Sequence, residues 1–211
     1  MFTGIIQQIG DIKKTASKNG SKVVYITKSA LLKNLKTNDS VNIDGICSTV
    51  EEIQNDCFKV TYMPETLKLT TASIWQEKTL VNLEPALSLN DKLNGHMLQG
   101  HIDCMGEIKK ITKKSDSYDI DIGFPKELSK FIALKGSVAV DGVSLTISFV
   151  DENFFSISLI PHTLENTTLG KKKENDKVNI EVDIISRYLL RLFEERDNQT
   201  SYEFLKERGF I

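Results

Sequence analysis

Apolar and polar residues alternate in short runs along most of the chain, up to about residue 182. An alternation with a period of two is typical of β-strands that bury one face. The clearest runs are VVYIT (23–27), FKVTYM (58–63), YDIDIGF (118–124), FFSISLI (154–160) and KVNIEVD (177–183). Turn-forming stretches such as KNG (18–20) and DEN (151–153) separate them. Strands at this density predict antiparallel β-structure, closed or sandwiched.

The pattern also repeats itself. The segment SVNIDGICSTV from Ser40 returns as SVAVDGVSLTI from Ser137, an offset of 137 − 40 = 97 positions. The offset holds without a gap over about forty residues, and a tandem duplication of this kind predicts two folded units with similar binding surfaces. The recurring residues include Pro64 with Pro161, Thr66 with Thr163, Leu67 with Leu164, and Glu84 with Glu181. We expect about six strands in each unit.

The duplication sets the domain organisation. We expect one β-barrel over residues 1–90 and a second over 96–184, joined by the polar stretch SLNDKLNG (88–95). Short helices are predicted at 29–34, at 125–131, and as single turns that begin at Pro64 and Pro161. The fold class is therefore mainly all-β, as two tandem barrels.

After Asp183 the apolar period lengthens to that of a helix. Apolar side chains recur at three- and four-residue spacings on one face: Ile185, Tyr188, Leu189, Leu192 and Phe193. A second helical piece is expected over 201–208. The segment 185–211 has no copy in the first repeat, and we interpret its apolar stripe as an oligomerisation surface. The alternative is that the stripe packs against the barrels of its own chain.

Composition narrows the classes of function. Lys and Arg total 27 against 29 Asp and Glu, a net charge of −2, which gives little support to nucleic-acid binding. No stretch reaches the ~18 continuous apolar residues of a membrane helix, and the start MFTGIIQQIGDIKK does not have the form of a secretory leader. Three widely spaced cysteines do not suit a disulfide framework. We expect a cytoplasmic protein with neither nucleic acid nor membrane as partner.

Two copies of one loop carry candidate chemistry. DGICST (44–49) corresponds to DGVSLT (141–146), so a tight Asp-Gly turn precedes Cys47 in one copy and Ser144 in the other. A thiol or hydroxyl in this place could serve as a nucleophile or in acid–base catalysis. The alternative is that Asp-Gly simply makes a hairpin. Unequal roles would produce the difference between Cys47 and Ser144, and drift after duplication would produce it too.

Two histidines lie at the junction of the repeats, in GHMLQGHID (95–103). A glycine precedes each of them, which permits a close backbone approach or a positive φ, so a loop near a ligand is expected. His96, His101 and Cys104 raise the alternative of a metal site, although their spacing matches no strong zinc pattern.

Taken together, the terminus MFTGI, the duplicated loop, the junction, and IPHTLENTTLGKKK (160–173) followed by VNIEVD resemble the riboflavin synthases of the alpha type. The likeness covers essentially all 211 residues in order. It implies two six-stranded Greek-key barrels of the flavin-reductase-like kind, and a C-terminal helix that holds a homotrimer together. The family's site forms between the N-terminal barrel of one subunit and the C-terminal barrel of its neighbour.

The resemblance also implies the reaction. Two molecules of 6,7-dimethyl-8-ribityllumazine are the substrate, and one donates a four-carbon unit to the other. The products are riboflavin and 5-amino-6-(D-ribitylamino)uracil, formed without a metal or a redox cofactor in the final step of riboflavin biosynthesis. The chief alternative is a non-catalytic lumazine- or flavin-binding antenna protein on the same scaffold.

By matching position, the resemblance implies a set of site residues. The N-terminal pocket contains Ser40, Cys47, Thr49, Glu65 and Thr66. The C-terminal pocket contains Ser144, Thr146, Ile160, Thr163 and Asp183. The segment Phe2, Thr3, Gly4 and Ile5 borders the site, and His101 lies near the reacting rings. Cys47, His101 and Ser144 are the catalytic candidates, and the other residues are expected to bind substrate.

The chain departs from the family pattern at a few positions. Asp44 and Ser48 stand where Asn and Leu are usual, His162 stands where Glu is frequent, and Cys104 replaces a small residue. These departures affect individual contacts more than the reaction. The retained Cys47, Ser144 and His101 favour the enzyme over the antenna protein.

Overall fold

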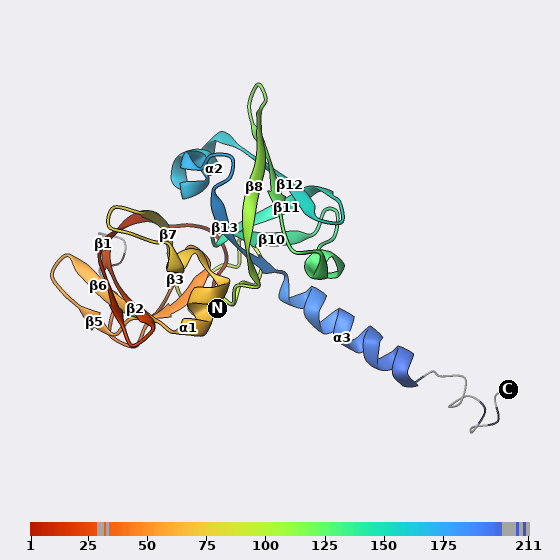
Figure 1. The fold of residues 1–211 in the computed structure, drawn as a ribbon, viewed down its shortest axis with the longest axis horizontal. Coiled ribbons are helices and arrows are strands. Elements are labelled where there is room, and N and C mark those ends of the chain that lie inside the picture. The colour runs from red at the N-terminus through yellow and green to blue at the C-terminus, as the bar shows by residue number, and fades with distance from the viewer. Residues whose placement is uncertain (29–31, 33, 200–205, 207–208, 210–211) are drawn as a thin grey trace.

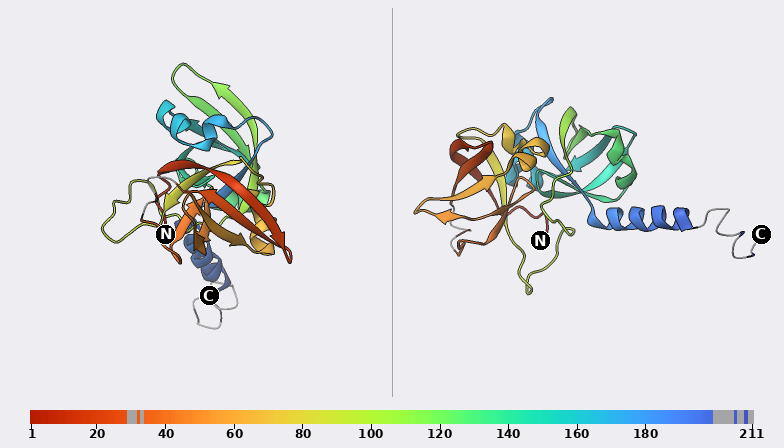
Figure 2. Two further views of the ribbon diagram at one scale, coloured as in Figure 1. Left: turned by 90° about the vertical axis from the view of Figure 1, so that its left-hand side faces the viewer. Right: turned by 60° about the horizontal axis from the view of Figure 1, so that its bottom comes forward.

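The structure is a computed structural model that describes residues 1–28, 32, 34–199, 206 and 209. Two β-units lie side by side, and one long helix, α3 (Ile184–Gln199), projects away from them (Figure 1). A turned view shows the same arrangement (Figure 2). The helices predicted at 29–34 and 201–208 fall largely outside the described residues.

The first unit is an antiparallel sheet that curls on itself. Its strands are β1 (Gln8–Lys18), β2 (Ser21–Thr27), β3 (Ser40–Ile43), β4 (Ile46–Thr49), β5 (Glu52–Ile53), β6 (Cys57–Tyr62) and β7 (Leu80–Pro85). They lie in the order β4-β3-β7-β1-β2-β6-β5. Two short helices, α1 (Pro64–Leu69) and η2 (Thr71–Ser73), connect β6 to β7.

The second unit is a closed barrel. Its strands are β8 (Cys104–Lys113), β9 (Tyr118–Gly123), β10 (Ser137–Val140), β11 (Val143–Val150), β12 (Phe154–Leu159) and β13 (Lys177–Val182). They lie in the order β10-β11-β12-β9-β8-β13. The helix η3 (Lys126–Phe131) precedes β10, and α2 (Pro161–Asn166) and η4 (Thr168–Lys171) precede β13. This is the strand order of the first unit when β4 and β5 together are matched to β11.

The predicted fold class, a mainly β protein with two tandem units and a C-terminal helix, is confirmed. The first unit differs from a barrel of six unbroken strands because the counterpart of β11 is interrupted after Thr49. There the Val50 amide donates to the Asp39 carbonyl and the Glu51 amide donates to the Lys59 carbonyl, each at 2.9 Å. The helical turns expected at Pro64 and Pro161 are present as α1 and α2, and the helix expected at 125–131 is the 3-10 helix η3.

The period-two alternation accounts for both cores. Strand β2 buries Val24 and Ile26 inside the first unit, and β9 buries Ile120 and Ile122 inside the second. The residues between them are only partly buried, as expected for strands with one face toward the core.

A third and smaller core joins the two units. Phe2, Leu98 and Ala139 are fully or almost fully buried there. Phe2 and Leu98 form an antiparallel bridge in which each backbone amide donates to the other residue's carbonyl, at 2.8 and 3.1 Å. The first residues of the chain therefore pair with the segment that opens the second repeat.

The apolar stripe of helix α3 is exposed on the surface of the chain. All five predicted stripe residues are exposed, and Tyr188 is the most exposed at 67%. Two ion pairs hold the helix to the second unit, Arg187 with Asp103, and Lys130 with Glu194 at 3.2 Å. The alternative that this stripe packs on its own barrels is wrong. Among the described residues, no helix combines the length and the apolar character needed to cross a bilayer.

Candidate active site

The two Asp-Gly turns lie back to back at the centre of the molecule. Asp44 and Gly45 have φ angles of 46° and 86°, and Asp141 and Gly142 have 46° and 76°, as a two-residue hairpin of the left-handed type requires. A Cβ atom on Gly45 would lie 2.9 Å from the Gly142 nitrogen, and one on Gly142 would lie 2.6 Å from the Gly45 nitrogen. Only glycine fits this contact, so the turns fix how the two units meet.

Each turn leads into a strand that carries the predicted reactive residue on its outer face. In β4, Ile46 and Ser48 are buried while Cys47 is half-buried and Thr49 is exposed. In β11, Ser144 is half-buried and Thr146 is exposed. Inside the first unit, the Ser48 hydroxyl bonds to the Tyr62 hydroxyl at 2.8 Å, so this departure from the family pattern is satisfied within the core.

Each reactive strand is held by a segment from the start of the opposite repeat. The Ser144 amide donates to the Gly4 carbonyl at 2.9 Å, and the Cys47 amide donates to the Gly100 carbonyl at 2.8 Å. Gly4 and Gly100 have φ angles of 76° and 80°, and a Cβ on either would lie 2.6 Å from the amide nitrogen it faces. Glycine is required at both places because the two backbones touch.

Two buried glutamates hold these crossing segments. Glu84 accepts from the amides of Thr3 and Gly4 at 2.7 and 3.0 Å. Glu181, its repeat counterpart, accepts from the amides of Gln99 and Gly100 at 2.7 and 2.9 Å. Burial raises the pKa of both Glu84 and Glu181, although the donated hydrogen bonds act against it. The glutamates therefore position the segments and stay out of contact with solvent.

A cavity of about 230 Å³ opens beside Cys47. Its lining brings together four of the predicted site residues, Cys47, Glu65, Thr66 and His101. The volume is smaller than the roughly 300–1,000 Å³ usual for a complete ligand pocket.

Ser40, Thr49 and the terminal segment do not line this cavity. Ser40 pairs with Thr49 across β3 and β4, and Ser40 lines a different cavity of about 480 Å³ that includes Leu35, Asp39 and Pro85. The fully buried Phe2 and the buried Thr3 support the terminal segment from within. Ile5, the counterpart of His101, is 40% exposed.

On the second side, Ser144 meets a histidine. The His96 Nδ1 atom and the Ser144 Oγ atom are 2.7 Å apart. Burial lowers the pKa of His96, and the nearby Asp183 partly offsets this. His96 is therefore neutral at pH 7, and a neutral imidazole can accept the proton of the serine hydroxyl or donate its own.

Four further predicted residues belong to this second side. Thr146 and Ile160 are exposed, and Thr163 is half-buried in the first turn of α2, where its amide donates to the Ile160 carbonyl at 3.0 Å. Asp183 begins α3 by accepting from the Ile185 amide at 2.9 Å. Ser144 does not line the cavity at Cys47.

Comparisons with known proteins show the family of this chain. The family described as Lumazine binding domain matches twice, at residues 3–86 and 99–183. The riboflavin synthase of Bacillus subtilis is 39% identical, and that of Actinobacillus pleuropneumoniae is 36% identical, each over all of both chains. The chain belongs to the riboflavin synthase family.

Two solved structures resemble this riboflavin synthase family member in fold. LumP complexed with riboflavin has a TM-score of 0.81 at 25% identity, and LumP complexed with 6,7-dimethyl-8-(1'-D-ribityl)lumazine has a TM-score of 0.79 at 24% identity. Both matches cover 86% of this chain and 99% of LumP.

The sequence prediction underrated His96 in this family member. It named His101 as the catalytic candidate, and His101 does line the Cys47 cavity, but the histidine that touches a predicted catalytic side chain is His96. The available signal was Gly95, where a Cβ would lie 2.0 Å from the Thr3 carbonyl oxygen and 2.9 Å from the Ser144 Cβ.

The metal alternative finds no support in the geometry. His96 faces Ser144, His101 faces the Cys47 cavity, and Cys104 is buried in β8. Burial raises the pKa of Cys104 to about 12. Within the described part of the chain, no three His, Cys, Asp or Glu side chains are grouped as metal ligands would be.

Proposed function

We propose that this chain is a riboflavin synthase that converts two molecules of 6,7-dimethyl-8-ribityllumazine into riboflavin and 5-amino-6-(D-ribitylamino)uracil. The observation that carries the proposal is the match to curated riboflavin synthases at 36–39% identity over all of both chains. A four-carbon unit passes from one substrate molecule to the other, so the two molecules supply every atom of both products. No cofactor is needed for that balance, and the reaction is the last step of riboflavin formation.

The duplicated structure suits a reaction between two like molecules. The Cys47 half carries a thiol, a carboxylate and hydroxyls around its cavity, and the Ser144 half carries the hydroxyl–imidazole pair with His96. Holding two substrates face to face supplies much of the acceleration, because effective molarities of about 10⁵ M or more are possible for well-oriented reactants. The two halves are proposed as the two substrate pockets.

The chemistry assigns different tasks to the two halves. One lumazine must lose a proton from its 7-methyl group, and the other must be attacked at its ring. His96 and Ser144 form a neutral pair that can relay a proton, while Cys47 offers a nucleophile or proton donor with His101 beside it. Ribityl hydroxyls need several partners when buried, and the proposed ones are Ser40, Thr49, Glu65, Thr66, Thr146, Thr163 and Asp183.

The complete site is proposed to form between chains. Ser144 does not line the cavity at Cys47, and a second copy is proposed to supply the opposite half. We propose that the barrel at 1–90 carries the Cys47 half of the site and the barrel at 96–184 carries the Ser144 half. The segment 185–211 is proposed to assemble a cytoplasmic homotrimer. The exposed apolar face of α3 supports this role, because a contiguous exposed apolar face is typical of an interface.

The test is to incubate the purified protein with 6,7-dimethyl-8-ribityllumazine alone and to follow riboflavin by absorbance. One riboflavin should appear for every two lumazine molecules consumed. A protein that binds the lumazine without forming riboflavin would instead be an antenna-type binding protein, the second candidate that the likeness to ligand-bound LumP raises. Ser144→Ala should bind lumazine and form riboflavin far more slowly, which rules out a contaminating enzyme as the source.

A further inference from the structure

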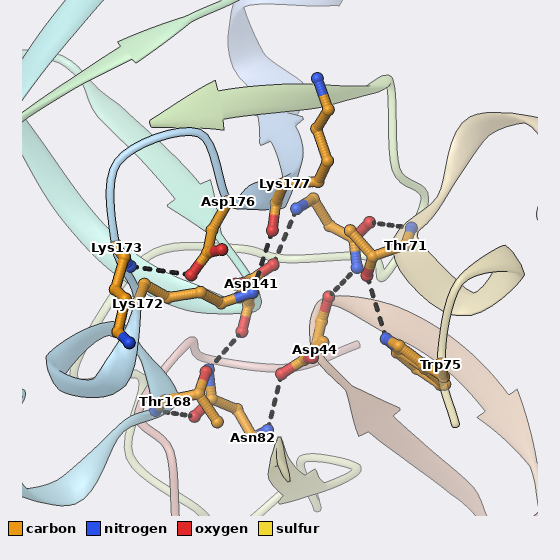
Figure 3. A network of polar contacts seen from close by, with 11 residues as sticks. Asp44, Thr71, Trp75, Asn82, Asp141, Thr168, Lys172, Lys173, Asp176 and Lys177 are labelled. Carbon is orange, nitrogen blue, oxygen red and sulfur yellow. Dashed lines mark hydrogen bonds and ion pairs between the residues drawn. The ribbon is translucent and has the colours of Figure 1, made fainter. Parts of the chain in front are cut away.

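Two aspartates are buried where the β-units meet (Figure 3). Asp44 and Asp141, the first residues of the back-to-back turns, are 2% and 0% exposed. Each accepts a hydrogen bond from a backbone amide of the same unit: Asp44 Oδ1 from Asn82 at 2.6 Å, and Asp141 Oδ1 from Asn179 at 2.7 Å. The pair lies outside the proposed substrate pockets and has no role in the proposed reaction.

Asn82 and Asn179 extend these contacts across the interface. The Asn82 side chain donates to the Asp141 carbonyl at 2.9 Å and accepts from the Thr168 amide at 2.7 Å. The Asn179 side chain donates to the Asp44 carbonyl and accepts from the Thr71 amide, both at 2.7 Å. Each unit thus holds the turn and the short helix of the other, and a change at either aspartate acts on both reactive strands.

Within the described part of the chain, two carboxylates and one cation, Lys172, meet at this centre. Lys172 Nζ lies 3.1 Å from Asp141 Oδ2 and donates to the Lys177 carbonyl at 2.9 Å. The residue 97 positions before Lys172 is Trp75, whose indole donates to the Thr71 hydroxyl at 3.2 Å. The two repeats therefore differ in charge at this place, because Asp141 has Lys172 beside it and the corresponding residue of the first repeat is Trp75.

Charge counting decides the protonation state of this group. If both carboxyls were ionised, the buried centre would carry a net charge of −1, and burying an uncompensated charge is very unfavourable. Burial raises the pKa of Asp44 well above its usual range, and the charge of Asp141 raises it further, against Lys172 and the Asn82 amide. Burial lowers the pKa of Lys172, but its ion pair with Asp141 acts against burial and the net shift is upward, so the lysine stays charged.

The other titratable groups facing the centre do not add a balancing charge. Tyr62 faces Asp44 from β6, and burial raises the pKa of Tyr62, so it stays neutral. Asp176 faces Lys172 and adds negative charge on that side. A proton on Asp44 is the remaining way to bring the Asp44, Asp141 and Lys172 group to zero charge.

We propose that Asp44 is held as a neutral carboxylic acid beside the ion pair of Asp141 and Lys172. The two carboxyl groups then carry one proton between them, and the three residues form an uncharged group that sets the spacing of the Cys47 and Ser144 strands. The strand residues follow their turn aspartates by three positions in both repeats. Loss of the proton would place like charges on turns whose glycine backbones already touch. This inference does not depend on the proposed reaction.

Infrared difference spectroscopy of the full chain at neutral pH tests the protonation directly. The wild type should show the carbonyl stretch of a protonated carboxyl, and Asp44→Asn should lose it. Asp141→Asn should lose it too, because Lys172 is then free to pair with an ionised Asp44. Asp56→Asn is the matched control, since Asp56 is an exposed aspartate already paired with Lys13, and the band should remain. A band absent from the wild type, or unchanged in Asp141→Asn, would overturn the shared-proton assignment.

Stability against pH gives a second, independent measurement. A carboxyl with a raised pKa in the folded state stabilises the fold at low pH and loses that contribution as pH rises from about 3.9, the ordinary aspartate pKa, to the folded pKa. Within that window, the unfolding equilibrium constant of the wild type should rise relative to that of Asp44→Asn by up to about tenfold per pH unit. A ratio that does not change with pH would contradict the proposal even if both proteins fold well.

Discussion

Ser144 donates its backbone amide to the carbonyl of Gly4, 140 positions earlier in the chain, at 2.9 Å. The contact places the terminus of the first repeat on the reactive strand of the second. Gly100 and Cys47 repeat the contact with the roles of the units exchanged. The position of each reactive side chain therefore depends on the opposite unit, and substitutions in these segments should affect catalysis.

Gly4→Ala tests this dependence. A Cβ at Gly4 would lie 2.6 Å from the Ser144 nitrogen, and the positive φ adds strain. We expect a loss of more than about 2 kcal/mol in the free energy of unfolding and a large fall in kcat. Gly20→Ala is the control, because Gly20 has a similar φ of 80° but its Cβ would meet only Pro64 at 3.6 Å. Urea unfolding of the two variants should separate them, and equal losses would show that φ alone matters.

Glu84→Gln should release the terminal segment. Both carboxylate oxygens of Glu84 accept hydrogen bonds, from Thr3 on one and from Gly4 and Asn42 on the other. Glutamine would turn an NH₂ group toward one of these donors, so we expect a loss of about 1–3 kcal/mol in stability together with lower activity. Glu152→Gln breaks only an exposed pair with Lys126 and should change stability very little. A Glu84→Gln protein as stable as Glu152→Gln would refute the positioning role.

The alternation and the 97-residue offset together predicted most of the architecture. They predicted the strands, the paired helical turns and the matched Cys47 and Ser144 loops, because these features recur at fixed spacing. The His96–Ser144 contact was not predicted, since 48 positions separate the two residues and the first repeat has no copy of His96. The break after Thr49 was also missed, because the side-chain pattern carries no mark of it, and the amide contact of Val50 with Asp39 has an equivalent in the unbroken β11, from Ile147 to Gly136.

The pH dependence of activity should report His96. Burial lowers the pKa of His96 below the ordinary 6.5, so the neutral form needed at Ser144 is lost only as pH falls below that value. The acidic limb of kcat/KM should therefore lie below pH 6.5. Asp183→Asn removes a charge that raises the pKa of His96 and should move the limb to still lower pH. Asp151→Asn is an exposed control and should leave the acidic limb in place. An acidic limb that also stays in place in Asp183→Asn would mean that a group other than His96 controls it.

The exposed stripe of α3 predicts the assembly. Leu189→Glu with Leu192→Glu should convert the proposed homotrimer to monomers in analytical ultracentrifugation, as should deletion from Tyr188 onward, because a charge on a buried interface is costly. Riboflavin formation should then disappear while the monomer keeps its β-structure by circular dichroism. Glu194→Gln alters only a half-exposed pair with Lys130 and should leave the assembly unchanged. Monomers that still form riboflavin would place the whole site in one chain.

Mixed assemblies test whether the site is shared between chains. Cys47→Ala removes the thiol from one half, and Ser144→Ala removes the hydroxyl from the other, so each protein alone should be nearly inactive. When the two are unfolded and refolded together, some interfaces will join the intact Ser144 half of one chain to the intact Cys47 half of another. Activity should return to a fraction set by random mixing, because only those interfaces hold both groups. The same mixture made in the Leu189→Glu, Leu192→Glu background should stay inactive, and no recovery in assembled mixtures would mean that Cys47 and Ser144 act within a single chain.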